Sequence, residues 1–527
     1  MQNVLKEVKS FCASINHNPC PNEQSPYKES HGEVYTPLEL VYHMLCQLPD
    51  YILSNPYTKY LDSGAGLGNF SLMLYFLLKS SQNISESHIL SNMLHMVEIN
   101  TINVEKIESI FNKLQQIQCG ENIDANIYHI DFLNEISKSN TPIKLHPNSF
   151  DVIYGNPPYN ISGRIKTPTN NTQVKTNDGI NAWVPFVRRA YDLLKPNGRL
   201  LYIIPSIWCK PDKAKIYELF TKRFQIEYLE FYSNTETNKI FSSQAQTPTV
   251  IIVARKLENP YYMRTKQTIP IYDTINKHIV SFTLRNEKAI PTKGLRIIEK
   301  LQNLILSEGS IMQYITKTSM PPLSASLIHK KTITHSNKNI HSAIISNKSS
   351  HPKELELVTK YSNIPLSHVN QKKLVLSHKM YGLPYYDVSG SYGISNRDNY
   401  VFILPELLEE FYEHYQMFLN SKIVQFILTC SRYRMMVIEK HIFDYIPQIH
   451  KMIKLNRLNP QYAEHSQYYT EEQSDSTRMK QNEVNIVMKS LEKLLTKEEA
   501  VYIDNNFHNY IYMDTKTELK SNNNRKN

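Results

Sequence analysis

Strand and helix patterns alternate along the first half of this chain of 527 residues, and this alternation is the strongest constraint on its fold. A strand pattern at 59–62 precedes a glycine-rich turn and a helix pattern at 70–79, and a strand at 95–99 precedes a helix at 103–116. Strands separated by helices pair in parallel, because each helical crossover returns the chain to the same end of the sheet. The sequence therefore predicts an α/β fold with a Rossmann-like, doubly wound sheet.

The alternation continues from a strand at 150–154 to a strand at 249–255 and stops near Leu257. Beyond that point, short strands mix with loops rich in Ser, His, Lys and Asn, and a chain of this length supports two cores. A last helix is expected from Thr496, which forms a capping box with Glu499. We expect four segments: a polar leader at 1–30, the α/β domain at 31–257, a C-terminal mixed α+β domain at 258–452, and a polar tail with a helix at 453–527.

Charge, cysteine usage and hydropathy narrow the class of protein. The chain carries 59 Lys and Arg against 49 Asp and Glu, a net charge of +10 that favours a polyanionic partner. Its six cysteines are scattered without zinc or redox spacing, which indicates free thiols, a reducing compartment and no structural metal. No apolar run reaches membrane-spanning length, and the N-terminus lacks a signal-peptide pattern. We therefore expect an intracellular, cytoplasmic protein that does not bind membranes.

The turn after the first strand contains Gly64, Gly66 and Gly68, and Asp62 ends the strand before it. Glycines let the backbone turn sharply and approach a ligand at a helix N-terminus, an arrangement that nucleotide-like cofactors use. Such a turn also occurs without any ligand, so on its own it has low specificity.

Three further residues follow the next two strands. Glu98 stands at a strand end, where a carboxylate can accept both hydroxyl hydrogens of a ribose. Asp131 can accept from an adenine amino group while Phe132 covers the ring. Each residue alone is more often an ordinary strand end or loop residue. Their order after the glycine turn favours a bound nucleoside.

The most informative stretch is Asn156-Pro157-Pro158-Tyr159, directly after the strand at 150–154. An aromatic amine is a poor nucleophile because its lone pair is delocalised into the ring. The Asn156 side-chain oxygen and the Pro157 carbonyl can accept its hydrogens and stabilise the positive charge that develops as it attacks a methyl sulfonium. The prolines fix both acceptors, and Tyr159 offers a ring on which the base stacks. The alternative is a proline-terminated strand whose Asn and Tyr are structural.

In the order and content of these motifs, the sequence resembles the gamma-type N6-adenine DNA methyltransferases of type II restriction-modification systems. Gly32–Pro37 resembles the family motif that lies over the methionine part of the cofactor. The resemblance implies that Asn156–Tyr159 is catalytic and that S-adenosyl-L-methionine is the cofactor. The cofactor-binding residues that it implies are Tyr35, Thr36, Pro37, Asp62, Gly64, Gly66, Gly68, Glu98, Asp131 and Phe132.

Two positions depart from the family pattern, and one match is less specific. Ser63 stands where a proline is common, and an insertion at 80–92 lengthens the spacing before Glu98. Phe241 is the best match to the aromatic residue that packs against the flipped base, although Phe231 and Tyr232 lie close by.

The second half is expected to be a DNA target recognition domain, because the segments 390–395 and 419–424 resemble parts of it. Adenine's amino group lies inside a duplex, so the resemblance implies base flipping in double-stranded DNA. A cognate restriction endonuclease is a candidate partner, and a monomer is expected. Candidate phosphate contacts are Lys330, Lys331, Lys338, Lys348, Lys353, Lys372, Lys373 and Lys379, and the arginines that can reach guanine edges or phosphates are Arg397, Arg432 and Arg434.

Three other functions stay open at this point. The same tetrapeptide occurs in methyltransferases that act on protein glutamine or RNA guanine, and a DNA-binding protein with a disused site would also keep it. The chain could also be the modification subunit of a restriction enzyme. Cleavage by the chain itself is disfavoured, because the nuclease-like letters at 211–215 are expected in a helix of the α/β domain.

Overall fold

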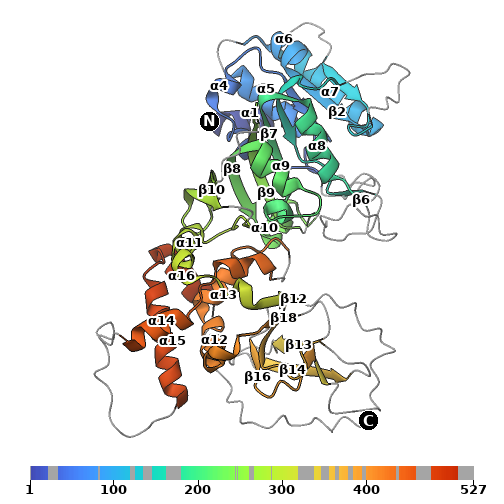
Figure 1. Ribbon diagram of the computed structural model, residues 1–527. Coiled ribbons are helices and arrows are strands. Elements are labelled where there is room, and N and C mark those ends of the chain that lie inside the picture. Colours follow the sequence, from blue (N-terminus) through green and yellow to red (C-terminus); the bar gives the residue numbers. More distant parts are fainter. Residues whose placement is uncertain are drawn as a thin grey trace. The chain divides into compact units, whose positions relative to one another are not determined.

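The computed structural model divides into two compact units, Met1–Lys293 with Tyr433–Met435, and Gly294–Arg432 with Met436–Asn527 (Figure 1). The residues that it describes are 2–21, 34–80, 84–118, 125–134, 145–161, 180–243, 245, 247–259, 266–285, 288–317, 338–345, 355–361, 367–377, 384–394, 399–434, 438–458 and 476–507.

A nine-stranded sheet, in the order β11-β10-β8-β9-β7-β4-β1-β2-β3, organises the first unit. Pairing is parallel from β3 through β2, β1 and β4 to β7, whereas β9 lies antiparallel between β7 and β8. The strands are β1 (Tyr60–Asp62), β2 (Leu94–Glu98), β3 (Asn126–His129), β4 (Phe150–Gly155), β7 (Leu194–Pro205), β8 (Phe224–Tyr232), β9 (Thr249–Lys256), β10 (Lys266–Asp273) and β11 (His278–Arg285). The predicted α/β class with a mainly parallel, Rossmann-like sheet is confirmed.

Helices occupy the connections between these strands. α5 follows the glycine turn and is buried along almost all of its length, which explains why its sequence is so apolar. The helices are α3 (Leu38–Leu45), α4 (Asp50–Leu53), α5 (Asn69–Lys79), α6 (Glu86–His88), the π-helix η1 (Ile89–Met93), α7 (Thr101–Gln118), α8 (Trp183–Leu193), the 3-10 helix η2 (Ser206–Cys209), α9 (Ile216–Arg223) and α10 (Asn234–Ile240). A short pair of strands, β5 (Asn160–Ile161) and β6 (Ile180–Asn181), lies between β4 and α8.

The boundaries of the first unit differ from those expected from the sequence. The N-terminal leader contains α1 (Gln2–Ser14), which packs against α5 and buries Val4, Val8, Phe11 and Cys12 in the main core. At the other end, β10 pairs with β8 and β11 pairs with β10, so the sheet extends well beyond residue 257. The alternation of strand and helix stops near Leu257 because these last two strands form a hairpin. The unit therefore ends at Lys293.

The second unit combines two small sheets with helices. One sheet has the order β12-β18-β15-β16 and the other β14-β13-β17. The strands are β12 (Ile315–Lys317), β13 (Lys338–Ile345), β14 (Leu355–Tyr361), β15 (Lys373–Ser377), β16 (Tyr385–Asp387), β17 (Gly393–Ile394) and β18 (Asn399–Phe402). The helices are α11 (Leu295–Glu308), α12 (Tyr412–Leu419), α13 (Lys422–Thr429), α14 (His450–Leu458), α15 (Ser476–Glu492) and α16 (Lys497–Asn506), with 3-10 helices η3 (Ile311–Tyr314), η6 (Glu406–Phe411) and η7 (Lys440–Tyr445).

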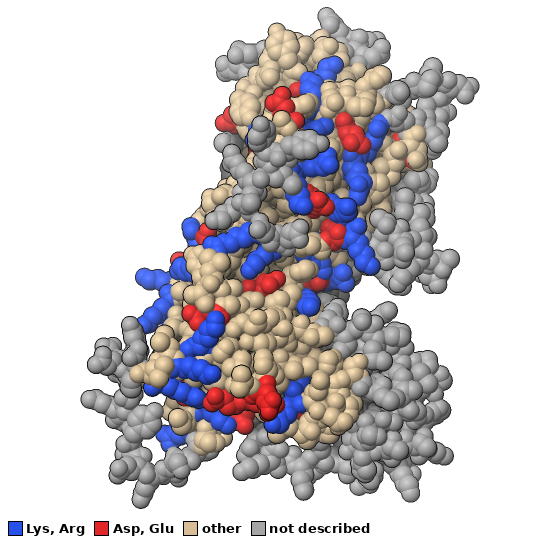
Figure 2. All heavy atoms as spheres, in the orientation of Figure 1, with Lys and Arg blue, Asp and Glu red and all other residues tan. Residues whose placement is uncertain are grey.

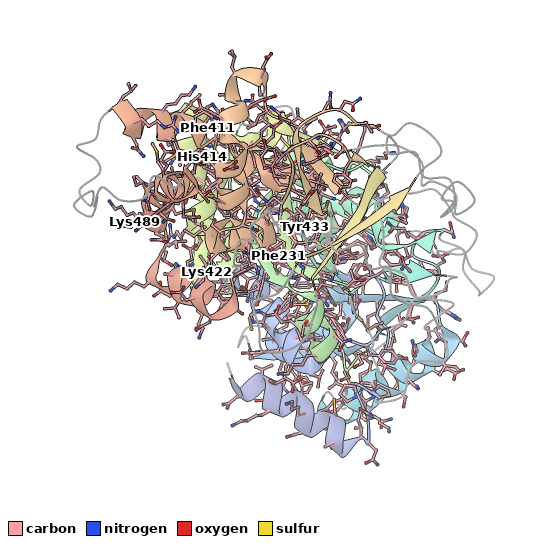
Figure 3. The ribbon with its side chains drawn as sticks, turned by 90° about the horizontal axis from the view of Figure 1, so that it is seen from below. Phe231, Phe411, His414, Lys422, Tyr433 and Lys489 are labelled. Carbon is pink, nitrogen blue, oxygen red and sulfur yellow. The ribbon has the colours of Figure 1, made fainter. Side chains whose placement is uncertain are left out.

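The expected tail is part of this second unit. α15 packs against α12 and buries Val484, Val487 and Leu491, and its Glu483 bonds to the buried His414 of α12 at 2.7 Å. Figure 3 shows Phe411 beside His414, with ring centroids 5.4 Å apart. α16 begins at the capping box formed by Thr496 and Glu499, as predicted. None of the helices in the described part of the chain is long and apolar enough to cross a membrane.

The packing of α1 leads to a stability prediction. Phe11 is 6% exposed and packs against Phe76 of α5, with the two rings tilted and their centroids 5.8 Å apart. Phe11→Ala should lower the free energy of unfolding of the first unit by about 3 to 5 kcal/mol, because it removes a buried ring and leaves a cavity. Chemical denaturation followed by circular dichroism measures this. Glu7→Ala, on the exposed side of α1, is the control, and equal unfolding curves for both variants would contradict the packing of α1.

Candidate active site

The predicted site residues follow the carboxyl ends of adjacent parallel strands. β1 lies between β4 and β2, and Asp62 of β1 stands in register with Tyr154 of β4 and Met96 of β2. Glu98 ends β2, and Asn156 directly follows β4. The structure therefore brings these three residues to one edge of the sheet, where ligands bind in folds of this type.

The glycine turn is tied to the end of β2 by backbone bonds. The Ala65 N–H donates to the Val97 carbonyl at 2.9 Å, and the Gly66 N–H donates to the Glu98 carboxylate at 2.7 Å. Gly66 has φ 57°, a left-handed conformation that favours glycine. A Cβ atom at Gly66 would lie 3.6 Å from the Tyr35 ring. The turn therefore passes close beneath an aromatic ring.

Glu98 is held in one orientation by the backbone. Besides the bond from Gly66, its second oxygen accepts the N–H groups of Ile99 at 2.9 Å and Asn100 at 2.7 Å. The side chain is 7% exposed. A carboxylate fixed by three backbone donors is preorganised, which suits the predicted contact with a ribose. That contact itself stays a prediction.

Asp62 lies fully buried behind the turn rather than open to a ligand. Its carboxylate accepts the Gly64 N–H and the Ser71 hydroxyl, both at 3.3 Å. Burial, helped by the nearby charge of Glu98 and opposed by the bonds from Gly64 and Ser71, raises the pKa of Asp62 to about 7. Asp62 therefore shapes the turn.

The departure at Ser63 has a structural reason. The Ser63 side-chain oxygen accepts the hydroxyl of buried Tyr202, of β7, at 2.7 Å. A proline at this position could not accept that bond, and it would also lack the N–H that Ser63 donates to the Tyr154 carbonyl at 3.3 Å. The serine thus joins the turn to the two strands beside it.

Asp131 and Phe132, the expected adenine contacts, follow the end of β3. Phe132 is buried and packs against Phe186 of α8 with ring centroids 4.9 Å apart. The Asp131 carboxylate bonds to the Leu133 N–H at 2.9 Å and to the Asn134 amide at 2.6 Å, so it stabilises the turn after β3. These contacts position both residues without testing their predicted roles.

Phe186 is a site residue that sequence reasoning missed. A Cβ atom at Gly64 would lie 3.9 Å from the Phe186 ring, so this ring contacts both the glycine turn and Phe132. In the sequence it shares helical spacing with Trp183 and Val187, and such a stripe predicts ordinary core packing. The one sequence signal for a place near the glycine turn was that α8 follows β4, the strand that ends at the candidate site.

Asn156 is the most distinctive residue of the site. Its amide nitrogen donates to the Val34 carbonyl at 3.4 Å and to the Thr36 hydroxyl at 3.2 Å. Its Oδ1 atom is buried and accepts no hydrogen bond from any described residue. Gly155 before it has φ 140°, and a Cβ atom there would lie 3.2 Å from the Asp62 carboxylate. The strand end thus packs tightly on Asp62 and presents a buried acceptor.

The two aromatic candidates differ in their surroundings. Tyr159 is half-buried, its backbone carbonyl accepts the Ala182 N–H at 3.1 Å, and its hydroxyl lies 3.4 Å from the Ile203 carbonyl. Phe241 caps the C-terminal end of α10, is 3% exposed and belongs to the main core. The predicted contact of Phe241 with a flipped base stays a prediction.

Several expectations for DNA contact need correction or lie outside the described residues. Lys373 is fully buried and pairs with the equally buried Asp387 at 2.6 Å, so it cannot contact phosphate. Lys372 forms an ion pair with Glu409 and stays half-exposed, so its phosphate contact stays a prediction. Figure 2 shows Lys and Arg mixed with Asp and Glu on the visible face. The residues outside the description are Gly32, Glu33, Lys330, Lys331, Lys348, Lys353, Lys379 and Arg397, together with the side chain of Lys338.

The nuclease-like letters at 211–215 form the turn before α9 and not part of a helix. The Asp212 carboxylate accepts the N–H groups of Ile216 at 3.3 Å and Tyr217 at 2.8 Å. These donors begin α9, so Asp212 has a structural task there.

The sheet, the glycine turn and the proline-fixed asparagine together define a Rossmann-like methyltransferase fold. Residues 51–241 match the Eco57I restriction-modification methylase family. The Type II methyltransferase M.BsuBI of Bacillus subtilis is 28% identical over 191 residues, which cover 34% of this chain. The match spans 35% of the length of that relative. These matches confirm the resemblance to type II restriction-modification methyltransferases over this segment.

Two solved structures are similar to this chain at a lower level. A putative class I S-adenosylmethionine-dependent methyltransferase from Listeria monocytogenes is 17% identical, with a TM-score of 0.33, over 51% of this chain and 72% of that one. A modification subunit of a putative type I restriction enzyme from Vibrio vulnificus is 13% identical, with a TM-score of 0.32, over 46% of this chain and 47% of that one. At these scores the likeness adds no evidence on function.

The family match implies S-adenosylmethionine as the cofactor, and the residues present fit it. Two aromatic rings border the glycine turn, because Cβ atoms at Gly66 and Gly64 would lie 3.6 Å from the Tyr35 ring and 3.9 Å from the Phe186 ring. Glu98 and the turn lie at the same strand ends as the buried Asn156 acceptor. A flat nucleoside with a polar sugar suits such surroundings.

The raised pKa of Asp62 predicts a pH dependence of stability. Between its ordinary pKa of 3.8 and about 7, the folded protein binds more protons than the unfolded chain, so this residue reduces stability as pH rises. Asp62→Asn removes the charge. Its Tm minus that of the wild type should therefore be more positive at pH 8 than at pH 5. Scanning calorimetry measures this with Asp50→Asn, at an exposed position, as the control. A difference that is equal at both pH values would contradict the assignment.

Proposed function

We propose that this chain is a site-specific DNA methyltransferase that transfers the methyl group of S-adenosylmethionine to the N6 amino group of a flipped-out adenine in duplex DNA. The observation that carries the proposal is the Oδ1 atom of Asn156. It is a buried acceptor at a proline-fixed strand end, beside the glycine turn, and no described residue donates to it. A buried acceptor without a donor is costly, and an amine hydrogen would remove that cost.

The chemistry of the site follows from where its acceptors lie. When bound, S-adenosylmethionine supplies an electrophilic methyl group on a sulfonium. Asn156 and the Pro157 carbonyl accept the two amine hydrogens of the base and stabilise positive charge on its nitrogen. Pro157 and Pro158 hold both acceptors in place before the base arrives, so little reorganisation accompanies the reaction.

Other residues of the first unit hold the cofactor in this proposal. Glu98 binds the ribose hydroxyls, and the backbone of Gly64, Gly66 and Gly68 lies along the nucleoside. Asp131 and Phe132 contact the adenine, and Phe186 packs against Phe132. Tyr35, Thr36 and Pro37 cover the methionine part, which agrees with the position of Tyr35 over Gly66.

DNA is the proposed substrate because the matching family is a restriction-modification methylase family and M.BsuBI is a Type II methyltransferase. The target adenine must leave the duplex at a cost of a few kcal/mol. The second unit is proposed as the target recognition domain that supplies groove and phosphate contacts. A cognate restriction endonuclease is the proposed partner in the cell.

The first experiment compares substrates. Purified protein is incubated with radiolabelled S-adenosylmethionine and, in parallel, with duplex DNA, RNA and a protein extract. We expect label in duplex DNA. Label in RNA or protein alone would favour the rival activities on RNA guanine or protein glutamine.

Asn156→Ala tests the acceptor directly. The variant should lose methyl transfer by at least about 100- to 1,000-fold, the loss expected when one preorganised partner of developing charge is removed. Cofactor affinity, measured by calorimetry, should fall far less than the rate, because Asn69 still holds the segment 34–37 when the Asn156 amide is removed. Asn92→Ala, at an exposed position, is the control. Wild-type rates in Asn156→Ala would rule out the assignment.

Substitutions at Tyr159 separate stacking from hydroxyl chemistry. Tyr159→Phe loses only a bond at 3.4 Å, which is near the upper limit for a hydrogen bond, and should remain active. Tyr159→Ala loses a stacking contact worth roughly 1 to 3 kcal/mol and should therefore lose activity by about 5- to 150-fold. Steady-state transfer to duplex DNA distinguishes the two. An equal loss in both variants would assign the role to the hydroxyl.

A further inference from the structure

The orientation of the Asn156 amide is fixed by the groups that it faces. Its nitrogen donates to the Val34 carbonyl at 3.4 Å and to the Thr36 hydroxyl oxygen at 3.2 Å. A backbone carbonyl can only accept, so the amide nitrogen and not the oxygen must point to Val34. A flipped amide would place two oxygens against each other there. Both amide hydrogens are thus engaged on one side of Asn156, and Oδ1 is presented on the other.

The Val34 carbonyl and the Thr36 hydroxyl belong to a segment that is itself bonded to the helix after the glycine turn. Asn69, the first residue of α5 after Gly68, donates its amide hydrogens to the Thr36 carbonyl at 2.9 Å and to the Pro19 carbonyl at 2.8 Å. Thr36 is 4% exposed. Two asparagine amides therefore hold the segment 34–37, one from the helix after the cofactor turn and one from the catalytic tetrapeptide.

We propose that Thr36 is a positioning residue for methyl transfer. Its hydroxyl oxygen accepts one amide hydrogen of Asn156 and so keeps Oδ1 directed to the amine of the base. This inference rests on the proposed function, and it gives Thr36 a task besides the expected contact with the cofactor.

Loss of this hydroxyl has a specific consequence. The amide hydrogen of Asn156 would be left without its acceptor in a buried position, and the weak bond to Val34 alone would hold the amide. Oδ1 would then spend less time in the reactive orientation. The step that suffers is transfer from the complete complex, which is reported by kcat, and not the binding of either substrate.

The test compares Thr36→Val, which keeps the shape and removes the acceptor, with Thr36→Ser, which keeps the hydroxyl. We expect kcat on duplex DNA to fall about tenfold in Thr36→Val and to recover most of its value in Thr36→Ser. The Kd of S-adenosylmethionine, measured by calorimetry, should change by a smaller factor than kcat, because valine keeps the shape of Thr36 in the segment that covers the methionine part. Thr58→Val is the matched control, because Thr58 is also buried and bonds to the Ile52 carbonyl away from the site. Thr36→Ala serves in place of Thr36→Val if the latter does not fold.

A double-mutant cycle separates positioning from packing. In an Asn156→Ala background, the valine substitution at Thr36 should cause no further loss of kcat, because the amide that it positions is gone. Unchanged kcat in Thr36→Val, or a loss confined to cofactor affinity, would overturn the inference alone. A wild-type protein that labels no DNA would overturn the proposed function, and the inference with it.

Discussion

The parallel register of β4, β1 and β2 is the constraint on which the rest of the site depends. It brings the ends of three strands to one edge, so that Asp62, Glu98 and Asn156 lie near one another although they are far apart in the sequence. The Asp62 side chain is packed behind the glycine turn. Residue 155 leaves room for this carboxylate because it is a glycine. The cost of burying this carboxyl appears in its raised pKa. The same contacts shape the glycine turn and hold the end of β4, at Gly155, close to it.

Hydrogen bonds from asparagine side chains then join the parts of the site that the sheet does not connect. Asn69 ties the segment 34–37 to α5, and Asn156 ties the same segment to the end of β4. Because this segment also carries Tyr35 over Gly66, the position of that ring beside the glycine turn and the orientation of the Asn156 amide depend on one piece of chain.

Much of the first unit could be predicted from its sequence, because its strands are short, apolar and followed by glycine, proline or acidic residues at the functional edge. The boundaries of this unit could not be predicted. The hairpin of β10 and β11 lacks the strand and helix alternation, and the apolar face of α1 is too short to distinguish from a polar leader. Lys373 looked like a phosphate ligand because its partner Asp387 is distant in sequence. Phe186 was missed because a ring on an apolar helix stripe predicts core packing.

The central claim is that the buried Oδ1 atom of Asn156 accepts a hydrogen bond from the amine of a flipped-out adenine. The most direct test is to treat duplex DNA with the purified protein and S-adenosylmethionine, digest the DNA to nucleosides and identify the methylated nucleoside by mass spectrometry. The account predicts N6-methyldeoxyadenosine in wild-type reactions and, at equal enzyme and time, at least about 100-fold less with Asn156→Ala. Methylated cytosine alone, or unmodified DNA from an enzyme that binds its cofactor, would contradict it.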